Sequence, residues 1–461
     1  MSRHDCTVFV LPGLGLDARA ALPLQAELDE GFRVIAIELP GQGSAPDAPD
    51  GSVEAQVDAA IGAIAAHADG GPWMLCAHSM GGKVAARIAA RMREGEDELF
   101  GLLGTVLLAP SPPSPEPMPD EKRQQMLSWV DAGPVPDDDA TTFVEDNVGA
   151  PLPPALQREV VDQVTGMSPL AWRRWLERGS IEDVTASVGV LDLPCRVLAG
   201  DADDALGAAA QPDLLGEVYP RARFVALAGA GHLLLSERPA EVARAIVDLW
   251  QEIRAHAVVV SAEWALLISS PRVTPRVRRS LARRALPDDP AYRPRVLRPA
   301  QLDQLRAVAD RIVPQSSGGR IDLAARVDAD LAAGGGDGWR PAGALSDTEA
   351  YRAGLDDLAR VWPEGAEAQD ALVRDLIAGE GVPGSVAEAE DLRRWFEDVR
   401  VDLVREWQCH PASFARIGYD GFATGAEDVS FAGYRTLAAG LRDEWEPADL
   451  GALPDDTEGV A

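Results

Sequence analysis

Ser79 stands in a sequence pattern that suits a reactive serine. The apolar run from Trp73 to Ala77 has the length of a buried strand, and an alanine-rich helical pattern follows the serine. A nucleophile at such a sharp strand-to-helix turn needs small residues two positions before and after it, because its backbone is strained. Ala77 and Gly81 meet this need. The pattern predicts that Ser79 is a nucleophile at the amino-terminal end of a helix.

His232 is the histidine whose position suits a base for this serine. A serine hydroxyl attacks an ester carbonyl at neutral pH only when a base takes its proton and an acid orients that base. The chain has six histidines, and His232 follows the last expected strand in the loop Ala-Gly-Ala-Gly-His. The chain order Ser, Asp, His places a base there. His78 adjoins Ser79 in the expected strand, and we expect its side chain to point elsewhere.

Three carboxylates compete to be the acid. Asp201, Asp203 and Asp204 all follow the apolar run that ends at Gly200. The loop after this strand supplies the acid in the chain order Ser, Asp, His. The residues alone leave the three alternatives open.

Two backbone N–H groups are needed to stabilise the oxyanion that forms when the serine attacks. Met80, directly after Ser79, supplies the first. The turn Leu11-Pro12-Gly13-Leu14-Gly15-Leu16 follows the first expected strand, and the N–H of Leu14 is the predicted second donor.

Short buried strands must carry these loops. Runs of about five apolar residues alternate with amphipathic stretches, which predicts an α/β class with a mostly parallel sheet buried on both faces. The expected strands are 7–11, 33–39, 73–77, 105–108, 196–199 and 224–227. Residues from about 111 to 191 read instead as a helical cap, with four aromatic residues that either line a pocket or pack the cap: Trp129, Phe143, Trp172 and Trp175.

The strand pattern stops after Trp250, which divides the chain further. With 461 residues the chain is too long for one core. We expect a first domain over 1–255, an arginine-rich, partly helical linker over 256–296, an all-α domain over 297–446 and a flexible acidic tail over 447–461. Apolar positions at helical period support the all-α domain.

The motifs of the first domain resemble those of the α/β-hydrolase superfamily of esterases and lactonases. The resemblance covers residues 5–253 and rests on Leu-Pro-Gly-Leu-Gly, Glu-Leu-Pro-Gly-Gln-Gly, Ala-His-Ser-Met-Gly-Gly, Gly-Asp-Ala-Asp and Ala-Gly-His. In such hydrolases the acid stands three positions after the strand-ending glycine. The resemblance therefore selects Asp203 over Asp201 and Asp204, giving the predicted catalytic residues Ser79, Asp203 and His232.

The second domain resembles the gluconate 2-dehydrogenase subunit 3 family. The motifs are Leu-Arg-Pro-Ala-Gln-Leu from Leu297, Trp395-Phe396, His410-Pro411 and Arg-Ile-Gly-Tyr-Asp-Gly-Phe from Arg416. The family comprises helical accessory subunits that bind a flavin-dependent dehydrogenase of the glucose-methanol-choline (GMC) type without carrying the flavin. The resemblance implies a partner subunit that holds FAD, and no cofactor in this chain.

Charge and composition restrict the other partners. The formal net charge is -31, which disfavours nucleic acids and anionic membranes. Four scattered cysteines fit neither a disulfide framework nor a zinc motif, so we expect no metal. No run approaches the ~20 apolar residues of a membrane span. Without a recognisable signal sequence, the expected location is the cytoplasm.

The leading functional hypothesis is a serine hydrolase of an ester or lactone, fused to a domain that docks a flavin-dependent sugar or alcohol dehydrogenase. Oxidation of a cyclic sugar at its anomeric carbon gives a lactone, which a serine hydrolase could open. One alternative is a non-catalytic binding or maturation subunit of a GMC-type oxidoreductase. Another is a generic carboxylesterase with an unrelated helical appendage.

Overall fold

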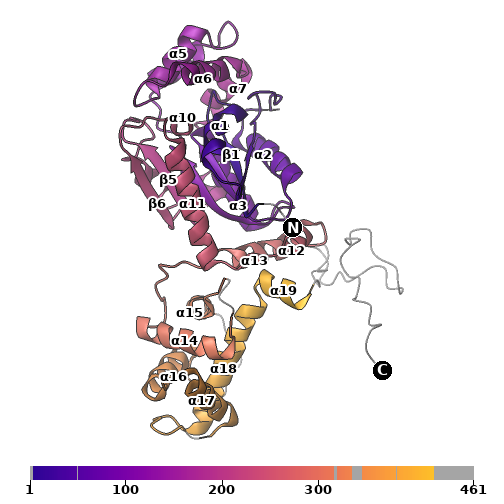
Figure 1. Cartoon of the computed structure of the whole chain (residues 1–461), viewed down its shortest axis with the longest axis vertical. Helices are drawn as coiled ribbons and strands as arrows, with labels where there is room; N and C mark the ends of the chain where they lie inside the picture. Colours follow the sequence, from indigo (N-terminus) through magenta and orange to yellow (C-terminus); the bar gives the residue numbers. More distant parts are fainter. Residues whose placement is uncertain (1–3, 49, 316–318, 335–344, 381, 420–461) are drawn as a thin grey trace, which may run out of the picture. The chain divides into compact units, whose positions relative to one another are not determined.

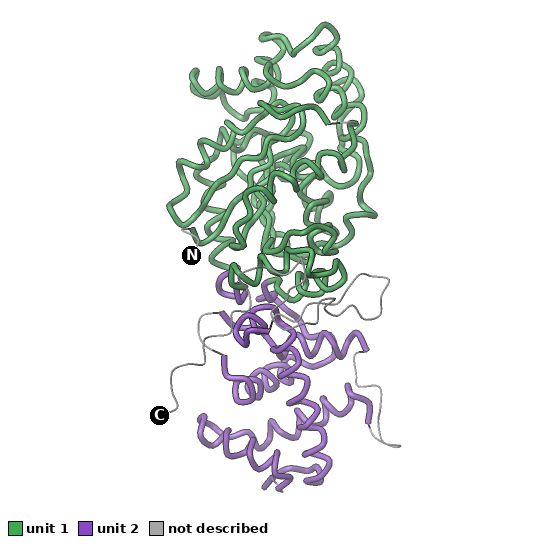
Figure 2. Tube along the Cα trace, turned by 90° about the vertical axis from the view of Figure 1, so that its right-hand side faces the viewer, with its two compact units in different colours: residues 1–253, 260–286, 421–461 green, residues 254–259, 287–420 purple. Residues whose placement is uncertain are grey.

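A computed structural model describes residues 4–48, 50–315, 319–334, 345–380 and 382–419. The described chain forms two compact units, which Figure 2 shows in different colours. The first contains residues up to 253 together with 260–286, and the second contains 254–259 and 287–419. The predicted tail over 447–461 and the stretch 420–446 of the predicted helical domain lie outside the described residues.

The first unit is built on a parallel sheet of six strands, in the order β2-β1-β3-β4-β5-β6. All six expected strands are present, so the predicted α/β class is confirmed. The strands are β1 (Cys6–Leu11), β2 (Phe32–Ala36), β3 (Trp73–His78), β4 (Leu102–Leu108), β5 (Cys195–Gly200) and β6 (Ala222–Leu227).

Burial differs between the middle and the edges of the sheet. Every residue of β1, β3 and β5 is buried, as expected for strands covered on both faces. The edge strands β2 and β6 are half-exposed, so the expectation of burial on both faces is wrong for them. An edge strand has a neighbour on one side only, and less of its surface is covered.

The order in which the chain adds strands to the sheet changes direction at β1. The chain passes from β1 outward to β2, and then returns to place β3 on the other side of β1. At such a switch point the loops after the two central strands separate and leave a crevice at the carboxyl ends. The loops after β1 and β3 are those that carry Leu14 and Ser79.

Helices surround the sheet, and a group of them is inserted between β4 and β5 as the expected cap. Figure 1 shows α5, α6 and α7 together at one end of the unit. The cap elements are α4 (Asp120–Ser128), α5 (Asp137–Asp146), α6 (Pro154–Gly166), α7 (Pro169–Arg174), the π-helical turn η2 (Trp175–Gly179) and α8 (Thr185–Val188). The others are η1 (Ala18–Ala21), α1 (Leu22–Glu27), α2 (Val53–His67), α3 (Met80–Glu94), α9 (Gln211–Leu215), α10 (Leu234–Glu237) and α11 (Pro239–His256).

The arginine-rich segment contains two helices that belong to the first unit, α12 (Ala262–Ser269) and α13 (Pro275–Ala285). The compact unit thus extends past residue 255, where the sequence places its end. The reason is Arg278, which is 2% exposed and donates to the carbonyls of Ile268 and Gly95 at 3.0 and 3.1 Å. A buried guanidinium needs such acceptors, and it fixes α13 against α3.

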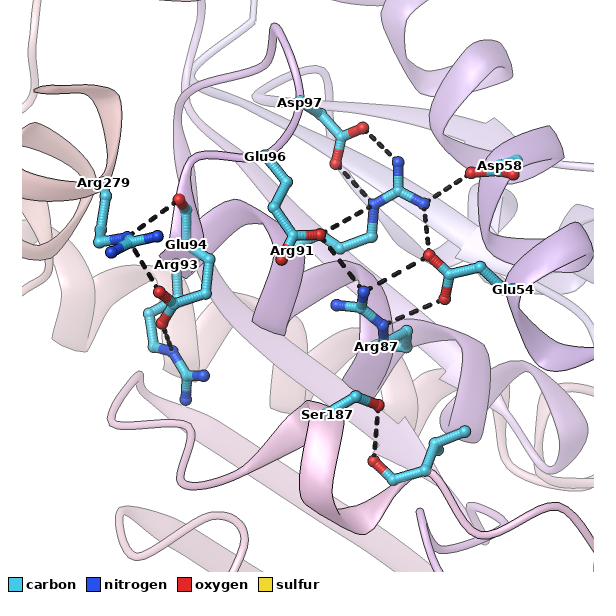
Figure 3. Close-up of polar contacts among 11 residues, drawn as sticks. Glu54, Asp58, Arg87, Arg91, Arg93, Glu94, Glu96, Asp97, Ser187 and Arg279 are labelled. Carbon is cyan, nitrogen blue, oxygen red and sulfur yellow. Dashed lines mark hydrogen bonds and ion pairs between the residues drawn. The ribbon is translucent and has the colours of Figure 1, made fainter. Parts of the chain in front are cut away.

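Ion pairs near the surface also connect α13 to α3, and α3 to α2 (Figure 3). Arg279 Nε lies 2.9 Å from the carboxylate of Glu94, at the end of α3. Farther along α3, Arg91 binds Glu54 at 2.8 Å and Asp58 at 2.6 Å on α2, and Asp97 at 2.5 Å. At least one arginine of the arginine-rich segment, Arg279, therefore pairs with an acidic side chain of the first unit.

The second unit is helical throughout its described residues, as predicted. Its helices are α14 (Pro299–Ile312), α15 (Leu323–Ala332), α16 (Asp347–Val361), α17 (Ala366–Ala378), α18 (Ala389–Gln408) and α19 (Pro411–Ile417). Trp395 packs directly against the backbone of Gly354, where an added Cβ would lie 2.3 Å from the ring.

Asp328 on α15 fixes the segment that enters this unit. Its carboxylate is fully buried and accepts from the hydroxyl of Tyr292 at 2.6 Å. It also accepts from the backbone amides of Arg295, Val296 and Leu297, at 2.6, 3.1 and 2.7 Å. One side chain thus satisfies four donors of the preceding loop.

We predict that Asp328→Ala lowers the free energy of unfolding of the helical unit by about 3 kcal/mol, because four donors lose their acceptor. Urea denaturation, monitored by circular dichroism, measures the change in the free energy of unfolding. Asp330→Ala, on the exposed side of the same helix, is the matched control and should change it by less than about 0.5 kcal/mol. Equal effects of the two substitutions would contradict this role of Asp328.

Candidate active site

Ser79 has a backbone conformation that L-residues rarely adopt, with φ of 49° and ψ of -119°. Among the described residues other than glycine, Ala109 is the other one with positive φ. Such a conformation costs about 1–3 kcal/mol and persists only where the surroundings enforce it. Here the Ser79 N–H donates to the carbonyl of Leu108 at 2.9 Å, and the Ser79 carbonyl accepts from Gly82 and Ser111 at 2.7 and 2.9 Å.

Small residues around Ser79 let three loops approach closely. A Cβ at Gly81 would lie 2.6 Å from the carbonyl oxygen of Leu11, and one at Gly82 would lie 2.3 Å from Cβ of Pro110. The expectation that a small residue is needed two positions after Ser79 is therefore met for a specific reason. The start of α3 touches the backbone that follows β1.

His232 and Asp203 are brought together from two loops at the carboxyl end of the sheet. His232 Nδ1 lies 2.7 Å from Asp203 Oδ2, and both side chains are mostly buried. The other carboxylate oxygen of Asp203 accepts from the amides of Ala205 and Leu206 at 3.0 Å each. Asp203 is thus fixed by its own loop and presents one oxygen to the imidazole.

The two competing carboxylates have other surroundings. Asp201 is exposed and accepts from the amide of Gly229 at 2.7 Å, which links the loops after β5 and β6. Asp204 is exposed on the wall of the cleft described below. Of the three candidates, the structure brings Asp203 to His232.

The loop of the predicted oxyanion donor Leu14 is held by Gln42, which is fully buried. Its side-chain amide donates to the carbonyl of Gly13 at 2.9 Å, and its oxygen accepts from the Leu39 amide at 3.0 Å. In the described part of the chain, the N–H groups of Leu14 and Met80 have no protein acceptor. Both donors are therefore unused by the fold.

A family model, that of the alpha/beta hydrolase family, matches residues 8–245, slightly more than half of the 461 residues. The chain belongs to the alpha/beta hydrolase family. No curated protein matches it.

Several solved structures resemble the hydrolase part of the chain. An esterase from Thermogutta terrifontis is 23% identical over 54% of this chain and 91% of its own, with a TM-score of 0.45. The enol-lactonase from Burkholderia xenovorans LB400 is 20% identical over 54% of this chain and 92% of its own, with a TM-score of 0.46. An esterase from Exiguobacterium antarcticum is 16% identical over 54% of this chain and 93% of its own, with a TM-score of 0.47.

The electrostatics of this hydrolase keep the Asp203 carboxylate ionised. Burial raises its pKa, but the hydrogen bond and charge of His232 and the two loop amides outweigh burial and lower the pKa to about 2. The folded pKa is below the ordinary aspartate value near 3.9. The pair therefore contributes stability above that value and loses it as the pH falls toward 2.

The expectation that the His78 side chain points elsewhere is wrong, because the side chain lies against His232 and lines the cleft. Its Nε2 donates to the carbonyl of His232 at 2.8 Å, and the two rings lie 4.8 Å apart. Burial, followed by the charge of His232, lowers the pKa of His78 to about 3, so its ring is neutral. The cap holds the same loop, because the Asn147 carbonyl accepts from the His232 amide at 2.8 Å.

Four of the predicted site residues, Leu14, Ser79, Asp203 and His232, line one cleft of about 910 Å³, a volume that includes space open to solvent; Met80 is not among the lining residues. Its apolar wall includes Phe143 and Trp175, two of the four cap aromatics. Trp172 instead packs inside the cap, fully buried, with its indole N–H on the carbonyl of Met126 at 2.9 Å. The polar lining residues are His78, Ser79, Glu116, Lys122, Asp146, Asn147, Asp203, Asp204 and His232.

Among the described residues, no group of three His, Cys, Asp or Glu side chains is arranged to hold a metal ion. No helix in the described ranges combines the length and apolar character needed to cross a membrane.

We predict that Asp203→Asn lowers kcat for a 4-nitrophenyl ester roughly 10³- to 10⁴-fold, because an amide cannot hold the imidazole and stabilise its charged form as a carboxylate does. Asp201→Asn weakens only a loop contact, and we expect a loss below about tenfold. Steady-state kinetics on both variants decide the matter, with Asp204→Asn as a further control. A larger loss at Asp201 or Asp204 would transfer the acid role to that residue.

Proposed function

We propose that this chain is a serine hydrolase of neutral esters or lactones, in which Ser79 is the nucleophile, His232 the base and Asp203 the acid. The observation that carries the proposal is the 2.7 Å hydrogen bond between His232 and Asp203, in the cleft that also contains Ser79. The strained turn at Ser79, typical of a nucleophile, supports it.

The hydrogen bond between Nδ1 of His232 and Asp203 determines which ring nitrogen acts as the base. With Nδ1 of His232 bound to Asp203, Nε2 is the nitrogen left to take the proton of Ser79. The serine oxygen attacks the carbonyl carbon, and the oxyanion accepts hydrogen bonds from the N–H groups of Leu14 and Met80. His232 then returns the proton to the departing alcohol oxygen. A water molecule, activated by the same imidazole, hydrolyses the acyl-enzyme.

The charge of the cleft favours neutral substrates. Four carboxylates line it, those of Glu116, Asp146, Asp203 and Asp204, against the single ammonium of Lys122. Such a lining raises the cost of bringing in an anionic ester and favours departure of the carboxylate product. A neutral lactone fits this charge pattern and becomes an anion only on hydrolysis.

We further propose that the helical domain docks a flavin-dependent dehydrogenase of the GMC type, with FAD held by the partner. The support is the resemblance of residues from about 295 to 440 to accessory subunits of such enzymes. A lactone released by the dehydrogenase would then reach the hydrolase at high effective concentration. Residues Asp420, Gly421 and Phe422 of the supporting motif lie outside the described residues.

Ser79→Ala should reduce hydrolysis of a 4-nitrophenyl ester or a γ-lactone roughly 10⁴-fold or more, because the attacking oxygen is lost. The melting temperature should remain within about 2 °C, since the Ser79 side chain makes no capping hydrogen bond to α3. Ester cleavage by spectrophotometry and scanning calorimetry test the two parts. Wild-type activity in the variant excludes Ser79, and an inactive wild type favours a non-catalytic binding subunit.

Docking is tested by co-expressing the full chain with a GMC-type flavoprotein from the same operon. We expect the two to co-elute on gel filtration with flavin absorbance, and Ser79→Ala to leave co-elution unchanged. A chain that ends at residue 286, which keeps α12 and α13 with the hydrolase unit, should retain ester hydrolysis and lose the partner. Hydrolysis with no flavoprotein bound by the full chain would favour a generic carboxylesterase with an unrelated appendage.

A further inference from the structure

Lys83 lies in α3, four residues after Ser79, and its side chain is fully buried. Its Nζ donates to three backbone carbonyls, those of Gly179 and Ser180 at 3.2 Å and of Glu182 at 2.8 Å. An ammonium group has three N–H donors. Each of them has an acceptor here, so the charged form of Lys83 is fully satisfied by one turn of the cap.

The carbonyls that Lys83 binds lie at the end of η2, the π-helical turn that begins at Trp175, and in the residues directly after it. The last carbonyls of a helix have no partner within the helix, and π-helical turns are rare and concentrate at functional sites. The turn closes tightly over Trp175, because a Cβ at Gly179 would lie 2.4 Å from its ring. Lys83 Nζ itself lies 5.9 Å from the centroid of that ring.

Trp175 is the link to the active site, because it lines the same cleft as Ser79. The helix that begins directly after the nucleophile thus holds, through Lys83, the turn that carries one wall of the cleft. Only two of the 43 basic residues Lys and Arg are lysines, Lys83 and Lys122. A planar guanidinium does not match three carbonyls gathered around one point, whereas an ammonium does.

We propose that Lys83 is a positioning residue that fixes Trp175 as a wall of the cleft and so sets the affinity for the ester, an inference that rests on the proposed function. Lys83 does not contact the reacting atoms. When the ammonium loses a proton, one of the three carbonyls loses its donor. The turn that carries Trp175 then loosens, and the cleft binds its ligand less tightly.

Because Lys83 can lose its proton, its effect on ligand affinity can be measured without mutating Lys83. Burial lowers the pKa of Lys83 to about 8, even though neighbouring carboxylates raise it. The charged groups that act on it are Glu116, Glu182, Asp183 and Arg123. Because the folded pKa lies below the ordinary lysine value, raising the pH through 8 does not remove stability from the fold. A loss of affinity in this range is therefore not caused by destabilisation of the fold through Lys83.

The experiment measures binding without turnover. The full chain with Ser79→Ala is titrated by calorimetry with 4-nitrobutyrophenone, a neutral ketone shaped like an aryl ester that cannot be hydrolysed. We expect Kd to rise roughly tenfold between pH 7 and pH 9.5. Adding Lys83→Met should raise Kd by a similar factor at pH 7 and abolish the pH dependence. Lys122→Met, the matched lysine control on the same cleft, should leave the pH dependence in place.

An unchanged Kd on Lys83→Met, or a pH dependence that survives it, overturns the proposal. So does a parent protein that does not bind the ketone, because Trp175 then borders no ligand site. If Lys83→Met does not fold, selective ¹⁵N-lysine labelling of the Ser79→Ala protein gives two side-chain signals. The signal that disappears in Lys122→Met belongs to Lys122. The remaining signal belongs to Lys83, and it must titrate over the same pH range in which Kd rises. Failure of the proposed function is detected separately, by the absence of ester and lactone hydrolysis in the wild type.

Discussion

The strained backbone at Ser79 is maintained by hydrogen bonds on both sides of the residue. Its N–H is bonded to the end of β4, and its carbonyl is bonded to Gly82 in α3 and to Ser111 at the start of the cap. These bonds require β3, α3 and the chain after β4 to converge on one point. The lack of side chains at Gly81 and Gly82 follows from the same requirement, since any Cβ there would meet neighbouring backbone or Pro110. The conformation of Ser79 is therefore enforced by the three segments that converge on it.

The imidazole side of the site depends on a different kind of support. His232 is held through its backbone as much as through its ring, by the Asn147 carbonyl of the cap and by Nε2 of His78. The carboxylate of Glu237 also accepts a hydrogen bond from the amide of Gly231 at 3.0 Å. Three separate segments thus determine where the ring lies. The cap is consequently part of the apparatus that orients His232, besides covering the cleft.

The sequence predicts the strands, the helices of the second unit, and Ser79 and His232 in the cleft, whereas Asp203 is selected from three carboxylates only by the family resemblance. Strands buried on both faces leave apolar runs, and a strained elbow demands small neighbours, so both features are visible locally. His78, Gln42 and Asn147 were missed because their roles depend on partners 154, 29 and 85 residues away. The packing of α12 and α13 with the first unit is not visible in the sequence for a similar reason. The acceptors of Arg278 include Gly95, which lies 183 residues earlier in the chain.

The burial of Lys83 has a practical consequence for chemical labelling. Amine-reactive dyes, cross-linkers and resins modify accessible lysines, and a lysine whose three N–H groups are engaged inside the protein is shielded from them. The other lysine in the sequence, Lys122, is part of the cleft lining. Lysine-directed attachment would therefore place the label or the resin at the cleft itself and obstruct it. Thiol or arginine chemistry, or an added tag, is the better route to an immobilised protein whose cleft stays open.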